Sequence, residues 1–381
     1  MNHEKVIYWI DLNRFDLKPD KSTWLEMSDT LSEYGFYVYV LTGYGHKRYS
    51  SKLKSFQVNC FRAWDIGWIF RTSLLLNIAI WLFKNGSKND IYILHPDSLY
   101  IAPFLRLLGR PHIHLDVRTL PVNIDNFKRK VDRLLFWKLP MTLFGRLAKS
   151  YSFITEPLKN SVETEFSRKY TSYIIWESGV NTDFFTRTPK NVLPSNKFKL
   201  FYHGSIAKNR GINLVVNAMK SLPSKYKKQI CFVIVGGGPG LADIKKIVTQ
   251  ESMSEYIEIK GMIPYDKIPQ EIATADCCIC PLPDREEWNV SSPLKVFEYM
   301  ASGKPLILTP ILAHKNILTD QDFVVWSKGD QVEDFVGAIK YAFDSREFLE
   351  TAAKIAPDFV RTKYDWLCQG KKLANYLNSI F

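Results

Sequence analysis

The sequence predicts an α/β protein with two doubly wound parallel sheets, one in each half of the chain. Short apolar runs typical of strands alternate with stretches of helical periodicity, as in units whose helices cover both faces of a parallel sheet. A chain of 381 residues is long enough for two such domains. Residues 186–198 contain two prolines and few apolar residues, so we expect the linker between the domains there.

The first half alternates regularly. Strands are predicted at 6–10, 36–41, 91–94, 112–117 and 151–154, and helices at 22–34, 66–83, 100–108 and 127–149. The apolar run 66–83 contains Arg71 and Asn77, so we expect a buried or surface-seated helix rather than a membrane span.

The second half repeats the pattern. Strands are predicted at 199–203, 230–235, 257–260, 277–280, 306–309 and 323–326, and helices at 212–222, 241–249, 268–274 and within 291–305. The tail from residue 332 onward is predicted to be helical, with a break at Pro357.

The charge balance favours anionic partners. Lys and Arg number 51 against 39 Asp and Glu, a formal charge of +12, which suits phosphates, nucleic acid or an anionic membrane. Residues 128–149 contain seven basic residues and one acidic residue, Asp132, interleaved with leucines and aromatics. That mixture fits an anionic bilayer surface, and it equally fits a packed helix with a solvated basic face. Pro140 is predicted to break this helix.

The six cysteines show no paired metal-ligand spacing. Cys277, Cys278 and Cys280 lie in an apolar run, where they are expected to act as small buried hydrophobic residues. Together with the lack of a signal peptide, this composition predicts a reducing, cytoplasmic location.

The stretch SSPLKVFEYMASGKP, residues 291–305, predicts a helix that holds an anion. Ser292 is expected to be the N-cap and Pro293 to lie in the first turn. A helix N-terminus offers unpaired amides and a positive dipole end. Lys295 adds a cation in that first turn, and Glu298 lies five residues after Pro293, about one and a half turns deeper. An amphipathic helix with an incidental lysine explains the same residues equally well.

Polar residues also mark the ends of predicted strands, where ligands of parallel sheets bind. In the first half these are Asp11, His95, Asp97, Asp116 and Arg118, although each could simply form a turn.

In the second half Gly204 ends a strand, and Arg210 lies on the following loop, where it could grip a phosphate. The run VIVGGGPG, residues 233–240, imitates a dinucleotide fingerprint but lacks the third glycine and the ribose-binding acid.

In order and spacing, the motifs WESGVNTDFF, HGSIAKNRGI, VIVGGGPG, IEIKGMIPYDKIPQEIATADCCICPL and SSPLKVFEYMASGKP resemble retaining glycosyltransferases of the GT-B fold, specifically family 4, the glycosyl transferases group 1. The resemblance is specific from Ser178 to Pro305 and architectural over residues 1–175. It implies an acceptor-binding Rossmann-like domain at 1–185 and a nucleotide-sugar domain at 186–364. A final helix at 365–381 is expected to pack back on the first domain.

The resemblance also implies site residues. Arg210 occupies the place of the basic residue that contacts the donor diphosphate, and Glu298 that of the glutamate that binds the nucleotide ribose. The remaining implied donor-binding positions are Gly204, Ser205, Gly237, Ser292, Pro293, Leu294 and Lys295. Asp116 aligns by position with a histidine near the donor sugar, so Asp116, Arg210 and Lys295 are the predicted catalytic residues.

The sequence departs from the family pattern at two positions. Val290 stands where a glutamate usually contacts the donor sugar, and Glu286 or Glu287 could replace it. Ser205 follows Gly204 where an arginine is usual, which leaves Arg210 and Lys295 to balance the diphosphate.

These observations predict transfer of a sugar from a UDP- or GDP-sugar to an acceptor hydroxyl, with retention, in surface polysaccharide or lipid-linked glycan synthesis. No cofactor or metal is expected, and the predicted location is the inner face of the membrane, bound peripherally through 128–149. A nucleotide-sugar epimerase, a nucleotide-binding oxidoreductase and a nucleic-acid-binding protein are the alternatives. The last is disfavoured because the basic charge lies among leucines without a nucleic-acid motif.

Overall fold

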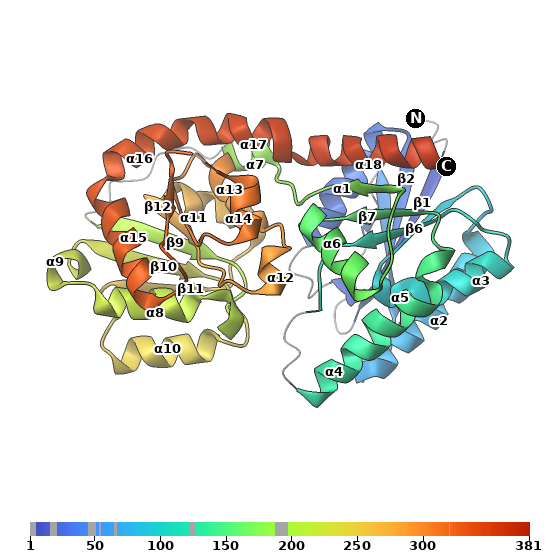
Figure 1. Ribbon diagram of the computed structural model, residues 1–381, viewed down its shortest axis with the longest axis horizontal. Helices are drawn as coiled ribbons and strands as arrows, with labels where there is room; N and C mark the ends of the chain where they lie inside the picture. The colour runs from blue at the N-terminus through green and yellow to red at the C-terminus, as the bar shows by residue number, and fades with distance from the viewer. Residues whose placement is uncertain are drawn as a thin grey trace. The chain divides into compact units, whose positions relative to one another are not determined.

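The computed structural model describes residues 5–15, 21–44, 51–52, 55–64, 67–121, 126–186, 197–319 and 321–381. It forms two compact units (Figure 1): unit 1 is Met1–Ser178 with Trp366–Phe381, and unit 2 is Gly179–Asp365. Each unit contains a mostly or wholly parallel sheet with interleaved helices, so the predicted fold of two Rossmann-like α/β domains is confirmed.

The sheet of unit 1 has the order β3-β4-β2-β1-β5-β6-β7-β8 and is parallel except for the β3–β4 pair. Its strands are β1 (Lys5–Arg14), β2 (Phe36–Tyr44), β3 (Ser51–Lys52), β4 (Phe56–Arg62), β5 (Ile91–Leu94), β6 (Ile113–Val117), β7 (Ser150–Phe153) and β8 (Tyr173–Ile175). The strand order reverses at β1, which has β2 on one side and β5 on the other. Such a switch point is where ligands of doubly wound sheets bind.

Strand β4 was not predicted. Its sequence, FQVNCFR, buries Phe56, Val58 and Cys60 and leaves the residues between them partly exposed. This alternation is a short strand pattern hidden in a polar stretch.

The helices of unit 1 cover the sheet. They include α1 (Lys21–Glu33), α2 (Gly67–Asn85), the 3-10 turn η2 (Pro96–Ile101), α3 (Ala102–Leu107), α6 (Glu156–Glu165) and α18 (Trp366–Ile380). Helix α18 packs on α1 so closely that a Cβ at Gly370 would lie 2.2 Å from the Thr30 methyl carbon. In the part of the chain that the structure describes, no helix is long and apolar enough to cross a membrane.

The basic segment forms four consecutive short helical elements: α4 (Phe127–Arg133), a π-helical turn η3 (Leu134–Lys138), α5 (Leu139–Phe144) and a 3-10 turn η4 (Gly145–Leu147). The predicted break at Pro140 coincides with an interruption of the α-helix, which ends at Arg133 and resumes at Leu139. The π turn, in which the Leu139 amide donates to the Leu134 carbonyl, precedes Pro140, which occupies the first turn of α5. A proline lacks the N–H that a regular helix would use, which accounts for the interruption of the hydrogen-bond ladder here.

The sheet of unit 2 is parallel throughout, with the order β11-β10-β9-β12-β13-β14. Its strands are β9 (Phe198–His203), β10 (Ile230–Val235), β11 (Ile257–Gly261), β12 (Cys277–Cys280), β13 (Leu306–Leu308) and β14 (Val324–Trp326). The switch point is at β9, between β10 and β12. Cys277, Cys278 and Cys280 are free and buried, as predicted, and burial raises the pKa of the Cys280 thiol.

The helices of unit 2 that matter for the site are the short α12 (Glu286–Asn289) and α13 (Leu294–Ala301). The others are α7 (Thr182–Thr186), α8 (Ile212–Ser221), α9 (Ser224–Lys227), α10 (Leu241–Gln250), α11 (Ile268–Ala273), α14 (Leu312–Ile317), α15 (Val332–Asp344), α16 (Arg346–Ala352) and α17 (Ala356–Tyr364), with 3-10 turns η5 (Lys208–Arg210), η6 (Tyr265–Lys267) and η7 (Ala353–Ile355). Pro357, predicted to mark a break, lies in the first turn of α17.

The boundary of unit 2 differs from the predicted one at residue 185. Residues 179–186 belong to unit 2 because they pair with its last residues: Val180 donates its amide to the Tyr364 carbonyl, and the Thr182 hydroxyl donates to Asp365. Of the predicted linker 186–198, residues 187–196 lie outside the described part of the chain.

Candidate active site

The start of α13 provides free backbone amides at the carboxyl end of the unit 2 sheet. The predicted N-cap is wrong: Pro293, not Ser292, holds the N-cap position, and it has no side-chain hydrogen bond to the helix. The first turn therefore leaves the amides of Leu294 and Lys295 without an intrahelical acceptor. Ser292 is buried just before this turn.

Lys295 is a buried cation beside the end of β9. Its side chain is 8% exposed, and its Nζ lies 5.1 Å from the ring centroid of Tyr202. A Cβ at Gly204, whose φ is 123°, would stand 3.3 Å from the Lys295 Cε, so glycine leaves room for the lysine. Burial lowers the pKa of Lys295, and the positive charge of Arg210 lowers it further. No carboxylate of the described residues lies within 4.0 Å of the Lys295 Nζ.

Arg210 is held at the same strand end by an aromatic neighbour. Its guanidinium carbon lies 4.8 Å from the ring centroid of Trp288, and the Trp288 indole donates to the Asn209 carbonyl at 2.7 Å. The next residue, Gly211, has a φ of 77°, and a Cβ there would lie 1.8 Å from the Pro281 carbonyl oxygen. The glycine thus allows the Arg210 loop to pack directly on the end of the sheet. Within the described part of the chain, Arg210 also has no carboxylate partner.

Glu298 is a buried carboxylate one turn below these cations. Its Oε1 accepts a hydrogen bond from the Tyr265 hydroxyl at 2.9 Å, and its Oε2 lies 3.0 Å from His203 Nε2. Burial alone would raise the pKa of Glu298, but His203, the Tyr265 hydroxyl and Lys295 together lower it. The side chain is therefore an ionised acceptor at neutral pH, and Tyr265, stacked on Phe184, borders it.

The glycine-rich turn after β10 serves backbone packing. A Cβ at Gly236 would lie 1.9 Å from the Gly204 carbonyl oxygen, and one at Gly238 would lie 2.5 Å from the Ile206 carbonyl oxygen. The Gly237 carbonyl accepts from the Ile206 amide at 2.8 Å, and Ser205 joins the same turn by accepting from the Tyr202 hydroxyl. The glycines thus position the Gly204 turn rather than forming a dinucleotide fingerprint.

One of the two predicted departures, Val290, and its two possible replacements lie on α12 or at its end. Val290 is buried at the C-cap of α12, while Glu286 is exposed and Glu287 half-buried in its first turn. The helix also carries Trp288, so either glutamate lies on the element that supports Arg210.

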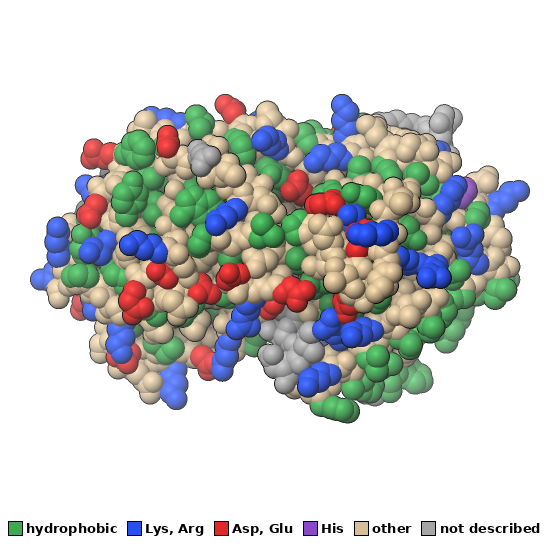
Figure 2. Space-filling model, viewed as in Figure 1, with side chains coloured by type: hydrophobic (Ala, Val, Ile, Leu, Met, Phe, Trp, Pro, Cys, Tyr) green, Lys and Arg blue, Asp and Glu red, His purple; other side chains and the backbone are tan. Residues whose placement is uncertain are grey.

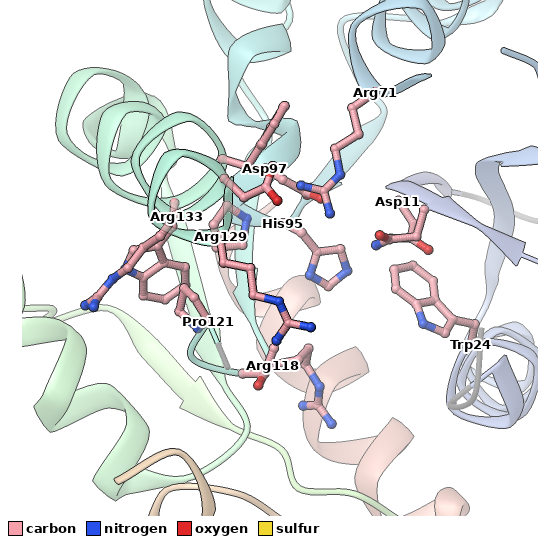
Figure 3. A pocket seen from close by; sticks show the side chains of 15 residues that line it. Asp11, Trp24, Arg71, His95, Asp97, Arg118, Pro121, Arg129 and Arg133 are labelled. Carbon is pink, nitrogen blue, oxygen red and sulfur yellow. The ribbon is translucent and has the colours of Figure 1, made fainter. Parts of the chain in front are cut away.

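Unit 1 contains a separate pocket of about 460 Å³ at its own switch point (Figure 3). Asp11 of β1, and His95 with Asp97 at the end of β5, line it together with Trp24 of α1. Four arginines also line it: Arg71 of α2, Arg118 directly after β6, and Arg129 and Arg133 of α4. The pocket therefore combines carboxylates, an indole face and several hydrogen-bond donors.

The central side chain of this pocket is His95, whose ring lies 4.9 Å from that of Trp24. Its Nε2 is buried and has no hydrogen-bond partner among the described residues. Arg118 is fixed by Trp176, with its guanidinium carbon 3.4 Å from the ring centroid and a 2.6 Å bond to the Trp176 carbonyl. Arg133 points away from the other labelled side chains in Figure 3 and pairs with Glu165.

Asp116 does not line the pocket. It is 1% exposed, and its Oδ1 accepts from the Ser152 hydroxyl at 2.6 Å. Ser152 and Ser150 also bond the ring of His114, so Asp116 belongs to a buried polar network between β6 and β7. The strand-end residues Asp11, His95, Asp97 and Arg118 are brought together as predicted. Trp24 and Arg71 were missed as site residues because each lies within an apolar helix pattern.

Comparisons with known proteins agree with the two-domain α/β architecture and indicate the class of enzyme. Residues 183–359 match the family model described as Glycosyl transferases group 1. The chain is 20% identical, over 358 residues and 90% of each protein, to an uncharacterized glycosyltransferase from Methanocaldococcus jannaschii.

Solved structures share the fold over the whole chain. Sucrose-phosphate synthase from Thermosynechococcus elongatus superposes with a TM-score of 0.78 at 13% identity, covering 99% of both chains. HepE from Anabaena, in complex with UDP, gives a TM-score of 0.70 at 13% identity, covering 98% of this chain and 100% of its own. WaaG, a glycosyltransferase involved in lipopolysaccharide biosynthesis, gives 0.68 at 12% identity, covering 97% of this chain and 99% of its own.

The protein is thus a glycosyltransferase with a GT-B-like architecture. The predictions of the GT-B fold and of a glycosyltransferase enzyme are confirmed.

Proposed function

We propose that the protein transfers a sugar from a nucleoside diphosphate sugar to an acceptor hydroxyl, with retention of the anomeric configuration, as in glycosyltransferase family 4. The observation that carries the proposal is the pair of cations at the end of β9. Lys295 and Arg210 have no carboxylate partner in the described part of the chain, and they lie beside the free amides of α13. Two neighbouring cations repel each other, and a bound diphosphate would remove that cost.

The same groups would stabilise the departing nucleoside diphosphate, whose negative charge grows as the bond to the sugar breaks. A preorganised donor of this kind typically contributes about 2.7–4 kcal/mol to the transition state. Glu298 is ionised and lies on the same helix as Lys295, so it can accept hydrogen bonds from the ribose hydroxyls of the nucleotide. The HepE structures contain UDP and UDP-glucose, which supports a uridine nucleotide as the donor.

The pocket of unit 1 is the proposed acceptor site. The indole of Trp24 offers an apolar face against which a sugar ring can stack, and Asp11 and Asp97 can accept hydrogen bonds from its hydroxyls. The buried, unpartnered Nε2 of His95 can bond one further hydroxyl. WaaG acts in lipopolysaccharide biosynthesis, which supports a surface polysaccharide or lipid-linked glycan as the acceptor class.

Metal-independent transfer stays a prediction. Among the described residues, no group of three or more His, Cys, Asp or Glu side chains is arranged to hold a metal ion. Lys295, Arg210 and the α13 amides are the groups available to neutralise the diphosphate.

The decisive experiment is incubation of the purified protein with a panel of UDP- and GDP-sugars, with and without lipid-linked glycan acceptors, followed by detection of free nucleoside diphosphate and of product. We expect one donor to release nucleoside diphosphate much faster when acceptor is present. Release of an altered sugar without any acceptor would instead identify an epimerase. Binding of NAD(P), followed by fluorescence and without turnover of any donor, would identify an oxidoreductase.

A further inference from the structure

Helix α2 of unit 1 is apolar on two opposite sides. One side packs on the sheet through Phe70, Leu74, Ile78 and Leu82, all of them buried. The other side exposes Ile69, Leu76, Ile80 and Phe83, each between 43% and 61% accessible. These four residues are spaced by seven, four and three positions, so they form one stripe along the helix. A surface helix that needed only to cover its sheet would place polar residues on that stripe.

The basic segment extends the apolar stripe. Phe127, Leu134, Leu139 and Leu143 are exposed along α4, η3 and α5. Side chains connect α2 directly with the basic segment. The Trp68 indole donates to Asp132 at 2.5 Å, and the Arg71 guanidinium lies 4.6 Å from the Phe136 ring centroid. In Figure 2 the apolar side chains gather at the lower right of the view, over α2, α3, α4 and α5 as labelled in Figure 1. We call the outer sides of α2, α4, η3 and α5 the α2–α5 face.

An apolar groove of about 420 Å³ runs beside the exposed stripe, between α2 and the η2–α3 segment. Leu76, Ile80, Phe83, Ile101 and Phe104 are among its lining residues. The lining hydroxyls are already occupied, because Thr72 donates to the Ile69 carbonyl and Tyr100 to the Leu135 carbonyl. The groove thus offers hydrocarbon surface and suits an alkyl chain rather than a polar ligand.

The net positive charge of the α2–α5 face indicates which kind of partner it would bind. The two helical paths, residues 67–85 and 127–144, carry seven basic residues and one acidic residue, and the acid, Asp132, is bonded to Trp68. Lys84, Lys128, Lys130 and Lys138 are exposed, and none of them forms an ion pair among the described residues. Exposed aromatic and aliphatic side chains surrounded by unpaired lysines match the acyl boundary and the anionic headgroups of a bilayer.

We propose that the α2–α5 face docks unit 1 on an anionic lipid bilayer, with Ile69, Leu76, Ile80 and Phe83 entering the headgroup–acyl boundary and the groove taking a lipid hydrocarbon chain. The lysines contact the headgroups around that apolar centre. The docking stands on this surface alone and does not depend on the proposed sugar transfer.

The test is flotation of the full-length protein with vesicles of phosphatidylcholine, with and without phosphatidylglycerol. We expect the protein to float with the anionic vesicles, and high salt to weaken its binding. The triple variant Leu76→Ser, Ile80→Ser, Phe83→Ser replaces three of the four stripe residues without touching the buried side of α2, and it should abolish flotation. Its matched control is Tyr341→Ser, Phe348→Ser, Ile355→Ser in unit 2, where the side chains are 53–58% exposed, and this control should float like the wild type.

A second pair of variants isolates the charge. Lys128→Gln, Lys130→Gln, Lys138→Gln should lower the partition coefficient onto anionic vesicles about a hundredfold, at about fivefold for each charge removed. Lys228→Gln, Lys245→Gln, Lys246→Gln removes the same charge from exposed sites in unit 2 and should leave partitioning unchanged.

Three results would overturn the proposal. One is a wild-type protein that stays with the soluble fraction at low salt, and another is equal loss of flotation in the stripe variant and its control. The third is a dimer in lipid-free solution that the stripe variant converts to monomer while flotation is unaffected, because the face would then bind a second copy of the chain. None of these measurements requires turnover, so a failure of the proposed reaction would be seen separately in the donor panel.

Discussion

Each unit places a buried acid near a histidine, but the two acids are used differently. In unit 2, Glu298 lies 3.0 Å from His203 and is also influenced by Lys295, a buried cation with no carboxylate partner in the described part of the chain. In unit 1, the Asp116 Oδ1 accepts from Ser152, whose hydroxyl also contacts His114, while the Asp116 Oδ2 has no hydrogen-bond partner among the described residues. A buried acid next to unpaired cations belongs to a site suited to a charged ligand, whereas one held by a serine hydroxyl of the neighbouring strand mainly joins two strands.

The largest expected effect comes from removing Lys295, the unpaired cation of unit 2. Lys295→Met keeps most of the side-chain volume and should lower kcat about 10²–10³-fold, because a preorganised donor to the leaving diphosphate is lost. Steady-state kinetics with the donor found in the panel would measure this. Lys208→Met, on the loop that carries Arg210, removes an exposed lysine paired with Asp243 and should leave kcat unchanged. Equal effects of the two variants would show that Lys295 acts only through general charge.

The two acids can be compared directly by amide substitution. Glu298→Gln should weaken nucleotide binding roughly ten- to a hundredfold, since a hydrogen bond to a charged group contributes about 1.5–3 kcal/mol. Asp116→Asn should leave nucleotide affinity unchanged, because the Asp116 carboxylate is bonded within the β6–β7 network. Calorimetric titration measures both. A loss of affinity in Asp116→Asn comparable to that in Glu298→Gln would restore the predicted donor-site role of Asp116.

The smallest expected effect concerns the histidines buried without a charged partner. Burial lowers the pKa of His114 in unit 1, and of His314 in unit 2, to about 4 from 6.5. The unfolded chain therefore binds protons below pH 6.5 that the folded protein accepts only near pH 4, so stability falls as the pH decreases through this interval. Each histidine should cost about 1 kcal/mol between pH 6.5 and pH 5.5.

Urea unfolding at a series of pH values tests this, with near-ultraviolet signals following each unit. His114→Asn and His314→Asn should each flatten the acid dependence of their own unit. A wild-type unfolding free energy that is constant over this pH interval would contradict the assignment.

Much of the fold could be predicted because its strands are continuous apolar runs. Residues 230–235, 277–280 and 91–94 were predicted with the bounds that the structure gives them. Strand β4 was missed because only alternate residues are apolar. The π turn before Pro140 was missed because the hydrophobic pattern does not report it.

The unit 2 site was predictable because its residues follow one another in recognisable motifs. The sequence could not show which hydrogen-bond and charge partners those residues have. The contacts of Glu298 with His203 and Tyr265 join residues far apart in the chain, and no local pattern reports them. The unit 1 pocket shows the same limit, since Trp24 and Arg71 look like ordinary helix residues until the sheet brings their helices to one edge.

The packing of α18 has a consequence for how the molecule is made. Unit 1 contains the first residues of the chain and also the last helix, which packs on α1 and whose Gln369 side chain accepts a hydrogen bond from the Glu177 amide. During synthesis, all of unit 2 leaves the ribosome before α18 does. The unit whose translation starts first is therefore completed only after unit 2, and the surface of α1 that α18 covers stays open until α18 has been synthesised.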